Sequence, residues 1–170
     1  MGLHLFTVGY AADRWDGFVR RLAPFGITHL VDVRTNPWSR YQEDYRGEEF
    51  AARVRSHGMK YVFMGDSLGG KPTREEVLTD GQLDPLKLRA DSFFQMGIQR
   101  VIEACSNEEN RVCLMCGCGK PEECHRGRIV CQVLHEQGVR VTHILPNGQT
   151  CTQADISGAI GADQGSLFVD

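Results

Sequence analysis

The sequence lacks any apolar run approaching the ~20 residues that a membrane-spanning helix needs. It also begins without a basic segment followed by an apolar stretch, the pattern of a secretory signal, so we expect a cytoplasmic protein with no membrane partner. Positive charge is not in excess: 19 Lys and Arg residues against 22 Asp and Glu residues give a net charge of −3. This balance does not favour non-specific attraction of the whole protein to a polyanion.

Internal repeats and low-complexity tracts are also absent, and no break in composition occurs before residue 147. A chain of 170 residues, 41% hydrophobic and 24% charged, is typical of one globular domain that buries a core without disulfides or a structural metal. We therefore expect one α/β domain over residues 1–147. Residues 148–170 are glycine-rich and poorly patterned, which predicts a C-terminal tail that packs on the body or on another chain, through residues 167–169.

The sequence does contain a regular alternation of strand-like and helix-like segments. Short apolar or β-branched runs predict strands at 3–9, 28–34, 60–64, 111–115 and 139–145. Helices are expected between them, beginning near Asp13, Glu48, Ser92 and His125. Strands separated by helices give right-handed crossovers and a parallel sheet covered on both faces. The pattern predicts an α/β protein with a single-domain, three-layer Rossmann-like fold and a mostly parallel sheet of about five strands.

Polar, glycine-bearing and reactive residues follow the expected strands. The loops after the first four strands are 9–10, 34–40, 65–71 and 116–126. Open parallel sheets bind ligands in the crevice outside the carboxyl ends of their strands. The sequence therefore predicts one candidate site, built from these loops at one edge of the sheet.

Cysteines gather in the last of these loops and in its flanks. Of the seven, five lie within 19 positions: Cys113, Cys116, Cys118, Cys124 and Cys131. Such crowding is unlike a disulfide framework and favours metal binding, thiol chemistry or simple packing. Packing suits Cys105, Cys113 and Cys131, which continue apolar patterns. Cys116, Cys118 and Cys124 lie among glycine, proline and charged residues, which favours a functional role.

Two functional interpretations of this loop remain open. Cys124 falls at or near a helix N-cap, which predicts a lowered thiol pKa, reinforced by His125 and Arg126, and hence a nucleophile or an anion site. Alternatively, Cys116, Cys118 and Cys124, with or without His125, are ligands for zinc or iron. The spacing is not a standard zinc pattern, and the deaminase signature is absent. Cysteine phosphatases have arginine six positions after the cysteine, and none of Cys113, Cys116, Cys118 or Cys124 has it.

Asp32 and Arg34 point to the same side of their strand. They form either a salt bridge at the strand end or a functional pair, in which Arg34 binds an anion while Asp32 positions a substrate hydroxyl or acts as a base. Four further residues are candidate substrate contacts: Ser39, Arg40, Gly69 and Gly70.

The motifs together resemble the domain-of-unknown-function 488 family over roughly residues 5–147. They are Thr7-Val8-Gly9-Tyr10, Leu30-Val31-Asp32-Val33-Arg34 followed by Pro37 and Ser39-Arg40, Gly58-x-x-Tyr61, Leu68-Gly69-Gly70, and Leu114-Met115-Cys116 leading to Cys124-His125-Arg126. The resemblance implies a compact α/β fold and no settled activity. It also implies a shared cleft holding Asp32, Arg34, Ser39, Arg40, Cys116, Cys124, His125 and Arg126. Relatives commonly have an acidic residue at the position of Cys118, so this chain favours the metal or thiol interpretation.

The leading hypothesis is an enzyme, a hydrolase or a transferase, that acts on an anionic small molecule, a nucleotide or a nucleic-acid end. In it Arg34 and Arg126 hold the anion, and Cys124 or Asp32, with His125, carries the chemistry. A second hypothesis is a regulatory or interaction module that binds zinc or iron through Cys116, Cys118 and Cys124. A third is a nucleic-acid-binding domain that holds phosphates with Arg34, Arg40 and Arg126.

Overall fold

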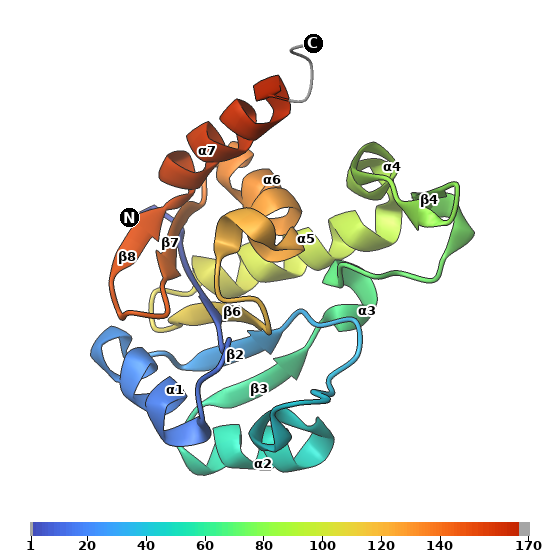
Figure 1. Ribbon diagram of the computed structural model, residues 1–170. Coiled ribbons are helices and arrows are strands. Elements are labelled where there is room, and N and C mark those ends of the chain that lie inside the picture. Colours follow the sequence, from blue (N-terminus) through green and yellow to red (C-terminus); the bar gives the residue numbers. More distant parts are fainter. Residues whose placement is uncertain (1, 167–170) are drawn as a thin grey trace.

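The computed structural model describes residues 2–166, and side chains over residues 2–160. Its centre is a six-stranded sheet in the order β3-β2-β6-β1-β7-β8 (Figure 1). The strands are β1 (His4–Gly9), β2 (His29–Asp32), β3 (Lys60–Phe63), β6 (Val112–Cys116), β7 (Arg140–Ile144) and β8 (Thr150–Thr152). All neighbouring strands are parallel except β8, which runs antiparallel to β7. A separate two-stranded hairpin joins β4 (Leu78–Thr79) to β5 (Gln82–Leu83).

Helices cover both faces of the sheet. They are α1 (Trp15–Leu22), α2 (Gly47–Ser56), α3 (Gly65–Leu68), α4 (Pro85–Ala90), α5 (Ser92–Ser106), α6 (Cys131–Glu136) and α7 (Gln153–Ser166), with a π-helical turn η5 (Arg126–Val130) directly before α6. Side chains of α1 and α2 form one apolar cluster with the sheet, and those of α5 and α6 form another. Figure 1 shows these two helix pairs on opposite sides of the sheet. The protein therefore has three layers.

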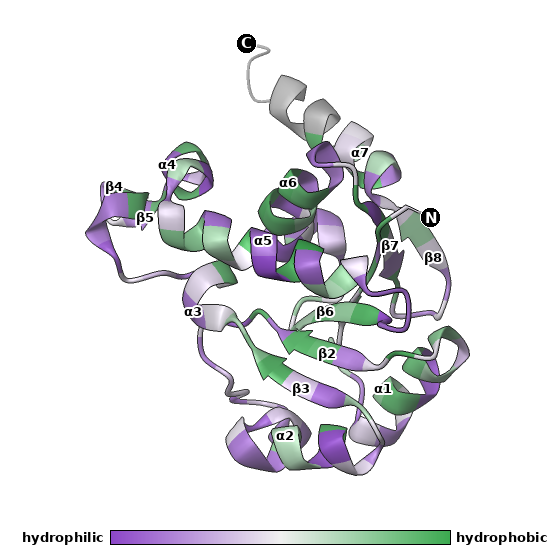
Figure 2. Cartoon of the chain, turned by 180° about the vertical axis from the view of Figure 1, so that it is seen from behind, coloured by the Kyte–Doolittle hydropathy of each residue, from purple (hydrophilic) through white to green (hydrophobic). Residues whose placement is uncertain are grey.

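The central strand β6 shows why the sequence adopts this arrangement. Its five residues are all buried, and alternate ones join opposite clusters, with Leu114 on the α5 side and Met115 on the α2 side. A strand covered on both faces is apolar throughout, and β2 and β6 carry the green apolar segments of Figure 2. The last residue of β6 is Cys116, so the packing of the core places this thiol at the carboxyl edge of the sheet.

The predicted α/β class, the three layers and the mostly parallel sheet are confirmed, with a strand at each of the five expected places. The sixth strand comes from the segment for which the composition predicts a tail. In the structure β8 pairs with β7, α7 packs against α6 and β7, and the side chains of Gln153 and Ile156 are buried. Residues 167–169, the predicted tail contact, lie outside the described residues.

Among the described residues, no helix has both the length and the apolar character that crossing a membrane would require.

Candidate functional site

A cleft of about 550 Å³ lies at the carboxyl ends of β2, β3 and β6, where the sequence predicts a site. Its walls come from the three loops that follow these strands. The lining residues are Arg34, Thr35, Asn36, Trp38, Gly70, Lys71, Cys116, Gly117, Cys118, Glu123, Cys124 and His125. The loop after β1 lies against this region from the side, since Gly9 is so close to the Cys118 carbonyl that a Cβ atom would lie 1.6 Å from its oxygen.

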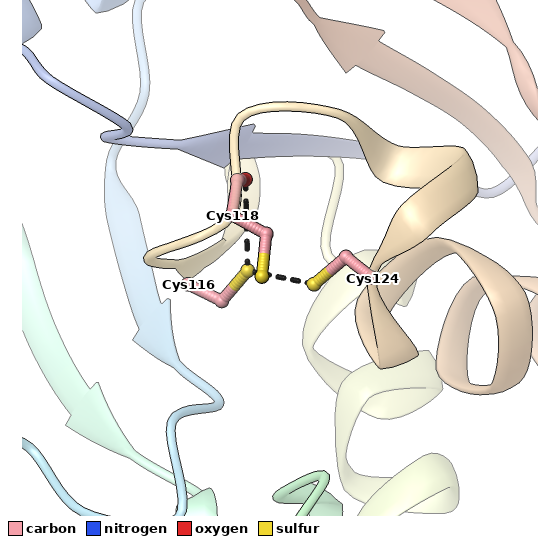
Figure 3. Close-up of side chains that lie close together, drawn as sticks. All are labelled: Cys116, Cys118 and Cys124. Carbon is pink, nitrogen blue, oxygen red and sulfur yellow. Dashed lines mark hydrogen bonds between the residues drawn. The ribbon is translucent and has the colours of Figure 1, made fainter.

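Three thiols meet in the wall of this cleft. The Sγ atoms of Cys116, Cys118 and Cys124 all lie within 4.8 Å of one another, and those of Cys116 and Cys124 are 3.0 Å apart. Figure 3 shows the three side chains pointing toward one another, from the end of β6, from the loop after it, and from the residue before the next helix. Cys116 and Cys124 are buried, whereas Cys118 is exposed. The residues that the sequence predicts as metal ligands are therefore brought together.

Arg126 lies behind the thiols with none of its surface exposed. Its Nε donates to Cys116 Sγ at 3.4 Å, its Nη2 donates to the Cys118 carbonyl at 3.1 Å, and its Nη1 donates to the Thr7 hydroxyl. No carboxylate of the described residues pairs with it. Burial opposes the charged form, yet the negative charge of the neighbouring sulfurs, Cys116 foremost, raises the Arg126 pKa. Because a buried guanidinium needs a negative partner, at least one of these sulfurs is a thiolate.

The favoured thiolate is Cys116. Hydrogen bonds from Cys118 and Cys124 and the charge of Arg126 hold the Cys116 thiol pKa well below its ordinary value, against the effect of burial. Donating to Cys116 raises the pKa of Cys124. Cys124 lies near the helix N-cap, as predicted: it directly precedes His125, the N-cap of η5, and its carbonyl accepts from the Arg128 amide at 2.9 Å. The predicted lowering of its pKa is nevertheless wrong, because two sulfurs in contact do not both ionise and it is Cys116 that accepts from the guanidinium.

His125 forms part of the cleft wall beside Cys124. Its Nε2 lies 3.2 Å from the Val33 carbonyl, which can only accept, so the ring proton is on Nε2 and Nδ1 remains an acceptor, 3.7 Å from Cys124 Sγ. Burial lowers the pKa of His125, so the ring is neutral at pH 7. Gly70 is needed for this contact, because a Cβ atom there would lie 2.5 Å from the ring.

Asp32 and Arg34 form the ion pair that was one of the two interpretations of their spacing. Arg34 Nε and Nη2 bind the two carboxylate oxygens at 2.9 and 2.7 Å, and the Tyr61 hydroxyl donates to the same carboxylate at 2.7 Å. Arg34 Nη1 donates to the Tyr45 carbonyl at 2.8 Å. Asp32 is fully buried and does not line the cleft. Arg34 lines it, but its charge is neutralised by Asp32.

Only some of the predicted site residues line the cleft. The site residues that line the cleft are Arg34, Gly70, Cys116, Cys118, Cys124 and His125, and those that do not are Asp32, Ser39, Arg40, Gly69 and Arg126. Ser39 accepts the Gln42 amide within its turn, Arg40 is exposed over Tyr41, and Gly69 has no room for a Cβ atom beside Thr35. The prediction of one cleft shared by all of them is therefore wrong in part. Trp38 and Lys71 were not singled out, although their loops follow β2 and β3.

A chain of buried hydrogen bonds connects Arg126 to the C-terminal elements. Arg126 can only donate, so the Thr7 hydroxyl accepts from it and donates to His143 Nδ1 at 2.6 Å. His143 Nε2 then donates to Gln153 Oε1 at 2.9 Å, and Gln153 Nε2 donates to the Gly127 carbonyl at 3.0 Å. Thr7, His143 and Gln153 are almost completely buried. The thiol site is therefore braced by β1, β7 and α7.

A family described as Domain of unknown function DUF488 matches residues 14–134, more than two thirds of the chain. Neither the curated proteins nor the solved structures gave a match. The matched segment includes all three thiols and the residues of the cleft wall, whereas Thr7, His143 and Gln153 lie outside it. The chain belongs to the DUF488 family.

Proposed function

We propose that Cys116, Cys118 and Cys124 bind one metal ion, zinc or iron, and that the protein is an enzyme that acts on an anionic ligand at this centre. The observation that carries the proposal is the meeting of three Sγ atoms within 4.8 Å of one another, beside the buried Arg126 and in the wall of a cleft.

The distances between the sulfurs suit a tetrahedral metal. Zinc–sulfur bonds of about 2.3 Å place the sulfurs of a tetrahedral site about 3.8 Å apart. The sulfurs of Cys116 and Cys124 are 3.0 Å apart, and no pair exceeds 4.8 Å, so shifts of about 1 Å bring all three to that value. Sets of thiolates in this geometry select zinc or iron over calcium or magnesium.

The charges also suit a metal. Three thiolates and a divalent cation carry a net charge of −1, which Arg126 balances at hydrogen-bond distance of Cys116. Without a metal, the proximity of the three sulfurs lets only Cys116 ionise, and the pKa values of Cys118 and Cys124 are raised. The protein thus supplies the positive charge that a trithiolate centre needs.

The cleft indicates a catalytic centre rather than a closed structural one. Structural zinc sites use four protein ligands, whereas catalytic sites use three and leave a position for water or substrate. The described residues bring three thiols together, and Cys118 is exposed at the cleft. A metal there would supply Lewis acidity, either polarising an anionic ligand or lowering the pKa of a bound water.

The test is the metal content of protein purified without added metal. We expect about one zinc or iron per chain, and loss of that metal in Cys118→Ser, whose exposed side chain is not needed for the core. Cys151→Ser is the control, because Cys151 is half-buried in β8 outside the cluster, and it should keep its metal. Metal-free protein, or Cys118→Ser with unchanged metal content, would overturn the proposal.

The lowered pKa of Cys116 supports a second candidate, a metal-free thiol enzyme with Cys116 in the nucleophilic role that the sequence suggested for Cys124. The same preparation separates the two. The thiol enzyme is expected to contain no metal and to lose one rapidly alkylated thiol in Cys116→Ser. Phosphate binding by Arg34 and Arg126 is not favoured, because both guanidinium groups are buried and bound to other residues.

A further inference from the structure

Trp38 is an unusually exposed aromatic side chain. With 56% of its surface accessible it contrasts with Trp15, which is 8% exposed in the core. Trp38 also lines the cleft that holds the thiols. Large aromatic side chains are usually buried, and an exposed one in a concave site is typical of a ligand contact.

The position of the Trp38 ring is fixed by Arg46. The Arg46 guanidinium lies 4.9 Å from the ring centroid, a cation–π contact that covers one face. Arg46 is itself held by hydrogen bonds to the carbonyls of Ser39 at 2.8 Å and Arg40 at 3.0 Å. Ser39 and Arg40 thus hold Arg46 through their backbone carbonyls. A ring fixed in this way loses little conformational freedom when a ligand stacks on it.

Lys71 supplies a positive charge to the same cleft. Its backbone amide donates to Thr35 Oγ1 at 2.9 Å, which joins its loop to the loop that carries Trp38. Its side chain is exposed, and no carboxylate of the described residues pairs with it. Glu123, the acidic residue of the lining, is paired with Lys120 at 3.2 Å. The ammonium of Lys71 is therefore available to an anion.

We propose that the cleft binds a nucleotide, with its base stacked on Trp38 and its phosphate beside Lys71. A planar aromatic group joined to an anion is the ligand that an exposed tryptophan and an unpaired lysine recognise together. The volume of about 550 Å³ lies within the ~300–1,000 Å³ of small-molecule sites. The proposal deepens the proposed function by naming the class of ligand that the thiol centre would meet. The nucleotide is either free or the end of a single strand.

The test is calorimetric titration of the purified protein with each of the four ribonucleoside 5′-monophosphates and with a 5′-phosphorylated single-stranded oligonucleotide. Adenosine, without phosphate, and ribose 5-phosphate, without a base, are the matched fragments. We expect binding of a mononucleotide, of the strand, or of both, at least tenfold tighter than either fragment. Mononucleotide binding alone identifies a free nucleotide, and preference for the oligonucleotide identifies a strand end.

Trp38→Ala is expected to weaken binding by roughly 5- to 150-fold, the range of a lost base stack, whereas Trp38→Phe keeps most of it. Tyr41→Ala is the control, because Tyr41 is 86% exposed in the same loop and does not line the cleft. Lys71→Ala should weaken binding of the nucleotide and of ribose 5-phosphate but not of adenosine. Lys60→Ala, which removes an exposed lysine at the start of β3 that does not line the cleft, should change the binding of none of the three. Far-UV circular dichroism reports that each variant is folded.

The proposal is overturned if no nucleotide binds, or if Trp38→Ala binds it as tightly as the unchanged protein. Failure of the proposed function is distinguishable by measuring the metal content of the unchanged protein that is used in the titration. Stacking that depends on Trp38 in a protein without metal supports the nucleotide site and contradicts the metal centre. A protein that contains the metal but binds no nucleotide supports the metal centre and contradicts the nucleotide site.

Discussion

Arg126 Nε lies 3.4 Å from Cys116 Sγ, and both residues are buried at the carboxyl edge of the sheet. A guanidinium in such a place is stable only with a negative partner, and the sulfurs of the cluster are the partners that the structure offers. The positive charge of Arg126 therefore stabilises thiolates at the end of β6. It does so both when Cys116 alone is ionised and when three thiolates hold a metal.

Removing the charge of Arg126 should therefore weaken metal binding. We expect Arg126→Gln to lower metal affinity by about 10–100-fold, the usual effect of losing a residue that supports metal ligands, and Arg126→Lys to lower it less. The measurement is competition with a chromophoric chelator. Arg128→Gln, an exposed neighbour two residues along the chain, is the control. Unchanged affinity in folded Arg126→Gln would show that the guanidinium does not balance the centre.

Thr7 is the link between Arg126 and His143. Valine has nearly the same shape as threonine, but Thr7→Val removes the hydroxyl that Arg126 Nη1 and His143 Nδ1 share as a hydrogen-bond partner. Each buried polar group left unsatisfied costs about 1–3 kcal/mol, so we expect a loss of that order in the free energy of unfolding. Urea denaturation measures it. Thr7→Ser keeps the hydroxyl and should recover most of the stability; a Thr7→Val variant as stable as the unchanged protein would show that the shared hydrogen bonds contribute nothing.

His143 should make the protein sensitive to acid. Burial lowers its pKa from the ordinary 6.5 to about 4. Above pH 6.5 the ring is neutral in both states, and between pH 6.5 and 4 only the unfolded chain takes up the proton. Stability is therefore lost as pH falls through this window, by up to about 3 kcal/mol. Urea denaturation at pH 7.5 and 4.5 should show a smaller pH dependence in His143→Gln. An identical dependence would place the acid-sensitive group elsewhere.

Asp32 should behave as a structural residue. Asp32→Asn breaks its bidentate bond with Arg34 and leaves a buried guanidinium without a carboxylate, which costs about 3–5 kcal/mol. We expect a large loss in the free energy of unfolding and, in the protein that stays folded, unchanged metal content. A variant of full stability that loses turnover would instead support the catalytic role that the sequence leaves open.

The central strands were predictable because their signal is local. In β6, burial on both faces makes every residue apolar, and a run of this kind can be recognised without knowing its neighbours. The Thr-Cys-Thr segment of β8 carries no such signal. It becomes a strand through pairing with the edge of β7, a contact between distant residues that composition does not reveal.

The position of the site was predictable for a topological reason, since parallel strands bring their following loops to one edge. Which of its charged groups are neutralised by a partner was not predictable. Arg34 and Arg126 have the sequence context of exposed arginines, and only packing shows that Asp32 and Cys116 neutralise them. The position of Cys124 near a helix N-cap was recognised, yet the pKa of Cys124 is set by the sulfur of Cys116, which lies eight positions earlier in the chain.

The most direct test is X-ray absorption at the edge of the metal that copurifies with the unchanged protein. The account predicts three sulfur ligands at about 2.3 Å, with the remaining position taken by a light atom, and one sulfur fewer in any metal retained by Cys118→Ser. A metal surrounded by nitrogen and oxygen alone, or a protein that contains none, would contradict it.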